Sequence, residues 1–117
     1  MNLSEMATIH KEAIIPDGTG KKTPAVELEY GNCLVGIYHP AIDTSTAFTF
    51  EASIDGITFV PVENGSGAAY SITINGSASG YIAVDTTKFL GIKFLKVVVA
   101  DNQTGAKTLT LAIRPLL

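Results

Sequence analysis

The sequence predicts an all-β chain folded as a single-domain antiparallel β-sandwich. Three observations lead to this prediction: apolar and polar residues alternate in short runs, turn residues separate those runs, and only one helical turn is indicated. A length of 117 residues suits one domain with a single core. We expect a jelly roll topology, with an immunoglobulin-like arrangement as the alternative.

The N-terminal segment is the part of the chain whose role the sequence leaves open. Residues 1–15 are expected to form either an extended N-terminal arm or an edge strand, in which Ile9 and Ile15 are the buried positions. Pro16 ends this segment, so we divide the chain into residues 1–15 and a β-sandwich domain over residues 16–117.

Two predicted strands open the sandwich domain. After a polar loop over residues 17–22, apolar residues alternate with glutamate across residues 26–30, as in a half-buried strand. A second, more apolar strand is predicted over residues 33–38. The lone cysteine, Cys33, heads this strand and is expected to be a buried small hydrophobic residue. With no second cysteine, an intrachain disulfide is excluded.

Residues 47–62 have the most regular pattern in the chain. Two alternating runs meet at Asp55-Gly56, a dipeptide that favours a two-residue type I′ hairpin turn. The expected register places Ile54 opposite Ile57 and Phe50 opposite Pro61, on one face of the hairpin. That face is predicted to supply five buried core residues: Phe48, Phe50, Ile54, Ile57 and Phe59.

Further strands are predicted over residues 70–74, 81–84, 92–100 and 108–114, with one helical turn over residues 86–90. Asp85 is expected to cap that turn at its N-terminus. The strand over residues 92–100 carries Leu95, Val97 and Val99 on one face, and Phe94 and Val98 on the opposite face. We therefore expect this strand to be covered on both sides.

Composition excludes several classes of partner. A net charge of −3 without a basic cluster argues against nucleic acid, because phosphate neutralisation needs grouped Lys or Arg. No segment approaches the roughly 20 apolar residues of a membrane span. Residues 1–15 are too polar for a signal peptide, so folding in a cytoplasm is expected. Charged residues make up only 16 % of the chain, which suits a protein that hides surface in an assembly.

No catalytic set is apparent in the sequence. His10 and His39 are the only histidines, and both are expected to face solvent or an interface. Residues 76–80 read Gly-Ser-Ala-Ser-Gly, with alanine where a nucleophile elbow needs serine. Metal-binding histidine motifs and phosphate-binding loops are also missing. We therefore expect a non-enzymatic protein without a cofactor.

Two kinds of binding site stay open as weaker alternatives. Five aspartates in loops are candidate calcium ligands, although turn and cap roles are favoured for each: Asp17, Asp43, Asp55, Asp85 and Asp101. Four tyrosines are candidates for a carbohydrate-binding platform, although burial at the ends of strands is favoured: Tyr30, Tyr38, Tyr70 and Tyr81. No metal ligand is assigned.

Residues 50–62 resemble the Ser-x-Asp-Gly-x-x-Phe hairpin of galactose-binding-like jelly rolls. A closer resemblance is to small structural proteins encoded beside the major capsid gene in tailed bacteriophages. It spans about residues 33–115 and rests on five elements in a fixed order. These are Val-Gly-Ile-Tyr-x-Pro at 35–40, the Asp-Gly hairpin, Tyr-Ile-Ala-Val-Asp at 81–85, Ile-Lys-Phe-Leu-Lys-Val at 92–97, and Arg114-Pro115.

The resemblance implies a virion component assembled in the host cytoplasm, with a capsid decoration (cement) protein that stabilises the head shell as the first interpretation. A carbohydrate- or receptor-binding module of a fibre or tail, with a glycan as ligand, is the alternative. The expected partners are the major capsid protein and further copies of this chain, with a trimer favoured. We expect capsid or subunit contacts at six residues: Ile9, His10, Ile14, Ile15, Phe94 and Val98.

Overall fold

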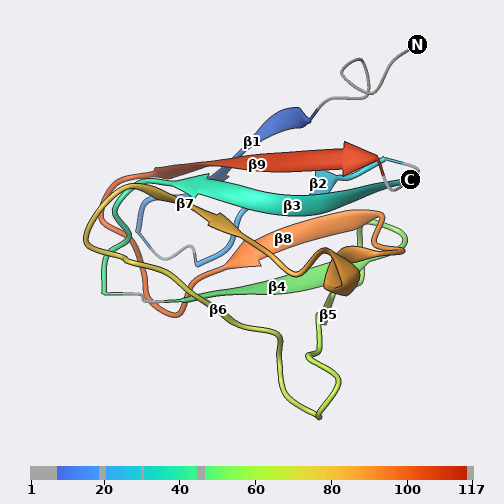
Figure 1. The fold of residues 1–117 in the computed structure, drawn as a ribbon. Helices are drawn as coiled ribbons and strands as arrows, with labels where there is room; N and C mark the ends of the chain where they lie inside the picture. The colour runs from blue at the N-terminus through green and yellow to red at the C-terminus, as the bar shows by residue number, and fades with distance from the viewer. Residues whose placement is uncertain (1–7, 19–20, 30, 45–46, 116–117) are drawn as a thin grey trace.

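The computed structural model describes residues 8–18, 21–29, 31–44 and 47–115. Two antiparallel sheets pack face to face in these residues and form one all-β domain (Figure 1). The only regular helix within the described residues is the short 3-10 helix η2 (Thr86–Phe89). The all-β, two-sheet architecture expected from the alternating pattern is therefore confirmed.

Each sheet combines strands from distant parts of the chain. The four-stranded sheet has the order β1 (Ile9–Ile15), β9 (Lys107–Pro115), β3 (Asn32–His39) and β7 (Gly80–Ala83). The five-stranded sheet has the order β2 (Val26–Glu27), β8 (Phe94–Val98), β4 (Ala47–Ser53) and β5 (Val60–Pro61), with β6 (Ile72–Thr73) also paired to β4. The chain crosses between the sheets at most of its connections, because only β4, β5 and β6 follow one another within one sheet.

Residues 9–15 are an edge strand and not a free arm. Strand β1 pairs with β9 along its whole length, from Ile9 opposite Ile113 to Ile15 opposite Lys107. Ile15 is fully buried as predicted, but the predicted burial of Ile9 was wrong, because 40 % of this residue at the end of the edge strand is exposed. Lys11 points inward at this edge, and its ammonium group donates a hydrogen bond to the carbonyl of Glu27, 2.8 Å away in the opposite sheet.

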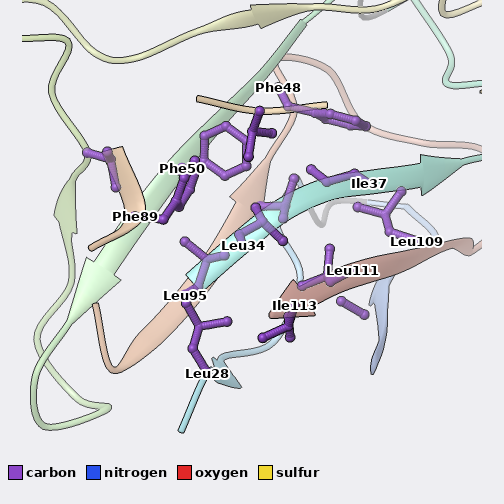
Figure 2. Close-up of a cluster of buried hydrophobic side chains, with 14 of the residues drawn as sticks. Leu28, Leu34, Ile37, Phe48, Phe50, Phe89, Leu95, Leu109, Leu111 and Ile113 are labelled. Carbon is purple, nitrogen blue, oxygen red and sulfur yellow. The ribbon is translucent and has the colours of Figure 1, made fainter. Parts of the chain in front are cut away.

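The core lies between the inward faces of the two sheets (Figure 2). Strands β3 and β9 contribute Leu34, Ile37, Leu109, Leu111 and Ile113, while β4, β8, η2 and the segment after β2 contribute Phe48, Phe50, Leu95, Phe89 and Leu28. Burying each of these side chains contributes about 1.5–3 kcal/mol. The alternation predicted for the two C-terminal strands is confirmed by the inward positions on β8 and β9.

The predicted Asp55-Gly56 hairpin was wrong in both turn and register. Strand β4 pairs with β5 as Glu51 opposite Pro61, so the register differs by one residue from the prediction. Gly56 has a φ of 77°, but Asp55 lacks the positive φ that a type I′ turn requires. Because side chains alternate along a strand, a shift of one residue moves Phe59 and Pro61 to the outer face.

Burial follows the observed register. Phe48 and Phe50 are buried as predicted, whereas Ile54 and Ile57 are 81 % and 84 % exposed, and Phe59 is half-buried. The connection between β4 and β5 is therefore a loop over residues 54–59 that adds little to the core.

Two other predicted strands are reduced to two residues each. In residues 26–30, only β2 is a strand, although Leu28 beyond it is fully buried, and Tyr30 lies outside the described residues. In residues 70–74, only β6 pairs with β4. Both segments lie at the borders of the five-stranded sheet, where tertiary pairing limits the length of a strand more than the alternation does.

Candidate functional site

The six residues predicted to contact partners lie in three different environments. Ile9, His10 and Ile14 are exposed on the edge strand β1, and Phe94 and Val98 are half-buried on the outer face of β8. Ile15 is fully buried between the sheets, so its side chain is not available to a partner. The structure thus does not bring the six together into one surface.

The outer face of the five-stranded sheet is partly covered by the chain itself. Gly56 lies against the ring of Phe94, since a Cβ added to it would be 3.4 Å from that ring. The segment carrying Lys22 forms a bridge to Val98, and the Lys22 ammonium lies 2.9 Å from a carboxylate oxygen of Glu51. Phe94 and Val98 are therefore partly closed off from any partner.

A network of hydrogen bonds orders the loop after β4. The Oδ1 atom of Asp55 accepts hydrogen bonds from Ser53 Oγ at 2.8 Å and from the backbone N–H groups of Ile57 at 2.8 Å and Thr58 at 2.9 Å. Ser53 Oγ in turn accepts from the N–H groups of Asp55 and Gly56. The bonds from Thr58, Ile57 and Ser53 lower the pKa of Asp55 to about 2.

The ordered loop displays two apolar side chains, Ile54 and Ile57, which we call the apolar tip. Val60 and Leu90 are also exposed at this end of the sandwich. Ile54 and Val60 line a cavity of about 390 Å³ together with Ile92. Exposed apolar residues that gather at one place mark interaction sites, whereas scattered ones do not.

A second exposed feature is the tyrosine pair, Tyr38 on β3 and Tyr81 on β7. The two residues lie directly opposite each other in the sheet, and their ring centroids are 4.5 Å apart at an interplanar angle of 48°. Tyr38 is 49 % exposed and Tyr81 is 47 % exposed. The prediction that tyrosines are buried at strand ends was therefore wrong for this pair. His10 on β1 adds a third ring, 6.1 Å from that of Tyr38.

Tyr70 differs from the tyrosine pair: it is half-buried and packs against the core, as predicted. Its ring stacks on Phe50 and meets Phe89 edge-on, with centroid distances of 5.9 Å in both cases. Its hydroxyl accepts a hydrogen bond from the backbone N–H of Asp85 at 3.1 Å. Only two of the four candidate tyrosines are thus exposed in the described residues.

The two histidines lie apart and in different surroundings. His39 is buried, contrary to prediction, because it points into the core and meets Phe48 edge-on at 5.7 Å. Its Nδ1 atom lies 2.8 Å from the carbonyl oxygen of Pro40. His10 is exposed on the edge strand.

Loop aspartates bind backbone N–H groups. The carboxylate of Asp43 accepts a hydrogen bond from the backbone N–H of Thr104 at 2.7 Å, and that of Asp17 accepts one from the backbone N–H of Gly105 at 2.6 Å. Asp85 caps η2 as predicted, and hydrogen bonds from Thr87 lower its pKa. Among the described residues, no group of three or more His, Cys, Asp or Glu could hold a metal ion.

In the part of the chain that the structure describes, no helix has the length and hydropathy of a membrane span. No protein-family model matches the sequence, and no curated protein matches it either. The resemblance to small structural proteins of tailed bacteriophages therefore stays a prediction. The apolar tip and the tyrosine pair are the two exposed features of the described residues that could bind a partner.

Proposed function

We propose that this protein is a non-enzymatic structural component of a tailed-phage virion, namely a capsid decoration (cement) protein that stabilises the head shell. The observation that carries this proposal is the apolar tip. Ile54 and Ile57 are held out by a loop whose backbone is already ordered by Asp55, so docking them costs little further conformational entropy. Burying them against the major capsid protein removes apolar surface from water.

A jelly roll topology is part of the same proposal. Four antiparallel pairs support it: β1 with β9, β2 with β8, β3 with β7, and β4 with β5. The pairs are nested: the first strand pairs with the last, and each later pair lies inside the previous one along the chain. A jelly roll has this nesting because a long antiparallel hairpin is wrapped into two sheets. Jelly rolls of two sheets occur in viral capsid domains and in lectins, so this topology fits either function.

We further propose that the chain forms a homo-oligomer, with a trimer as the expected state, and that it resides in the virion. The low charge of the chain and the exposed Ile9 and Ile14 on the edge strand support self-association. Light scattering of the purified protein tests this part, and a monomer at high micromolar concentration would leave only assembly on the capsid. Nucleic acid and membrane are not proposed as partners.

Capsid binding tests the decoration role. The double variant Ile54→Ser/Ile57→Ser should lose binding to purified capsids that lack this protein, while its thermal midpoint stays within about 2 °C of the wild type, because both side chains are exposed. The matched control is Tyr38→Ala/Tyr81→Ala, which changes two exposed side chains on the four-stranded sheet and should keep capsid binding. Undiminished binding of the first variant, or no binding of the wild-type protein, would refute the proposal.

Deletion experiments at the N-terminus should stop before residue 8. Removing residues 1–15 would also remove strand β1 and the buried Ile15, so the loss of capsid binding could reflect unfolding. A deletion of residues 1–7 retains strand β1 and the buried Ile15, and its binding to capsids measures the contribution of that segment.

A carbohydrate- or receptor-binding module of a fibre or tail is the second candidate function. The specific observation in its favour is the tyrosine pair, which leaves two rings half-exposed on the outer face of the four-stranded sheet. The two functions use different surfaces. Glycan binding without capsid binding would favour this second candidate.

A further inference from the structure

Two neighbouring rows of residues run across the strands on the outer face of the four-stranded sheet, and their side chains differ in size. One row runs across β1, β9, β3 and β7 through His10, Ala112, Gly36 and Ala83. The adjacent row runs through Glu12, Thr110, Tyr38 and Tyr81. Three small residues therefore lie beside the two tyrosines.

The small residues make room for the rings to lie across the sheet. A Cβ on Gly36 would overlap the hydroxyl end of the Tyr81 ring, so that ring lies over the backbone of β3. Ala112 also faces outward, yet it is only 3 % exposed, which is expected when neighbouring side chains lie across it. A larger residue at position 36 would force the Tyr81 ring to leave this position.

A shallow hollow of about 560 Å³ adjoins the tyrosine pair. Besides the two rings, its lining includes Thr108, Thr110 and Ser79. These three hydroxyl groups can each donate and accept hydrogen bonds. The volume lies within the range of about 300–1,000 Å³ that is typical of small-molecule sites.

Charge is sparse on this face. In the two rows, Glu12 is the only residue with a formal charge when histidine is neutral. Recognition here would therefore depend on ring contacts and hydroxyl groups more than on ion pairs, which disfavours charged ligands.

We propose that this face is a binding site for the pyranose ring of a neutral glycan. One face of a pyranose presents C–H groups, which pack on the electron-rich face of a tyrosine ring. The sugar's hydroxyl groups at the rim would pair with the threonine and serine hydroxyls of the hollow. The inference deepens the carbohydrate-binding candidate and rests on it, but it shares no residue with the apolar tip.

Binding to an array of neutral hexose and N-acetylhexosamine oligosaccharides tests the site, followed by saturation-transfer NMR with methyl glycosides of the sugars that bind. Tyr38→Ala and Tyr81→Ala should each weaken binding about tenfold, since each removes a stacking surface. Tyr81→Phe keeps the ring and should change affinity by less than about threefold. Gly36→Ala should resemble Tyr81→Ala, because it displaces the same ring.

Ile54→Ser/Ile57→Ser serves as the control and should bind the array like the wild type, which separates this site from capsid docking. Circular dichroism checks that each variant is folded. No binding of the wild-type protein to the array would overturn the inference. Glycan binding that survives Tyr38→Ala/Tyr81→Ala would also overturn it, because the sugar would then bind elsewhere. If that double variant loses capsid binding and the wild type binds no glycan, the face contacts protein instead.

Discussion

Strand β4 and the loop that follows it have the same sequence character but opposite roles. Both alternate apolar and polar residues, yet β4 buries Phe48 and Phe50, whereas the loop exposes Ile54 and Ile57. The difference lies in the backbone. Strand β4 is held in the sheet by β8 on one side and by β5 and β6 on the other, so its inward residues face the core between the two sheets. An alternating pattern predicts burial only where the ladder of strand pairing continues.

The end of the ladder is set by Asp55. Its carboxylate accepts hydrogen bonds from the backbone N–H groups of Ile57 and Thr58. In a two-residue hairpin these N–H groups would point elsewhere. Side chains beyond Ser53 are thereby turned away from the core. An apolar tip on an ordered loop is the result, and the following predictions test this contrast between strand and loop.

The largest effect is expected on the strand side, at Phe50. Its ring is 5.0 Å from that of Phe89 and is almost completely buried. Phe50→Ala should lower the free energy of unfolding by about 3–5 kcal/mol, because it leaves a cavity between the sheets. Urea denaturation measures this loss. A loss below about 1 kcal/mol would mean that β4 does not supply the core as described.

A smaller effect is expected at Ser53, where the strand ends. Its hydroxyl accepts from two backbone N–H groups and donates to Asp55, and the residue is buried. Ser53→Ala should lower the free energy of unfolding by about 1–2 kcal/mol and reduce the hydrogen-exchange protection of the Gly56 amide. Ser53→Thr keeps the hydroxyl and is the control. Unchanged protection in Ser53→Ala would show that the loop is ordered by other contacts.

Acid should weaken the loop without first unfolding the strands. The folded pKa of Asp55 is lowered from 3.8 to about 2, so the ionised carboxylate favours the ordered loop. This contribution is fully present above pH 3.8 and is lost as the pH falls through about 2. NMR titration of the Ile57 and Thr58 amides should report a midpoint near 2. A midpoint at 3.8 would contradict the hydrogen-bond network, and Asp55→Asn should abolish the titration of both amides.

Much of the fold was predictable because local patterns and tertiary pairing agree. Leu109, Leu111 and Ile113 recur at every second position of β9, and all three are buried on its inner face. Asp85 caps η2 through a local hydrogen bond to Thr87. The Asp-Gly dipeptide misled because aspartate favours both a type I′ turn and a loop in which its carboxylate accepts nearby N–H groups.

The exposed surfaces were less predictable because they depend on pairing between distant segments. Whether Ile15 is buried depends on the pairing of β1 with β9, at the other end of the chain. Tyr38 and Tyr81 were named as candidates, but their exposure depends on Gly36 lying beside the Tyr81 ring. No local pattern encodes that neighbourhood. The one local signal was Gly36, a glycine inside an apolar strand and two positions before Tyr38, because such a glycine often marks a close approach of another group.

The smallest effect is expected on the loop side, at Phe59, which the one-residue shift places on the outer face. Phe59 is half-buried, and the ammonium group of Lys96 lies 4.3 Å from the centroid of its ring. Because such a cation–π contact at an exposed site is worth about 0.5–1 kcal/mol, Phe59→Ala should lower the free energy of unfolding by about 1 kcal/mol.

A double-mutant cycle with Lys96→Met isolates the contact between the ring and the cation. The coupling free energy between Phe59→Leu and Lys96→Met should be about 0.5 kcal/mol. High salt should reduce this coupling, whereas it should not reduce the loss of stability in Phe50→Ala. A loss in Phe59→Ala as large as that in Phe50→Ala would restore the two-residue hairpin register, because only that register places both rings in the core. The contrast between strand and loop would then be wrong. A small loss at Phe59 together with a large one at Phe50 is the result that the observed register requires.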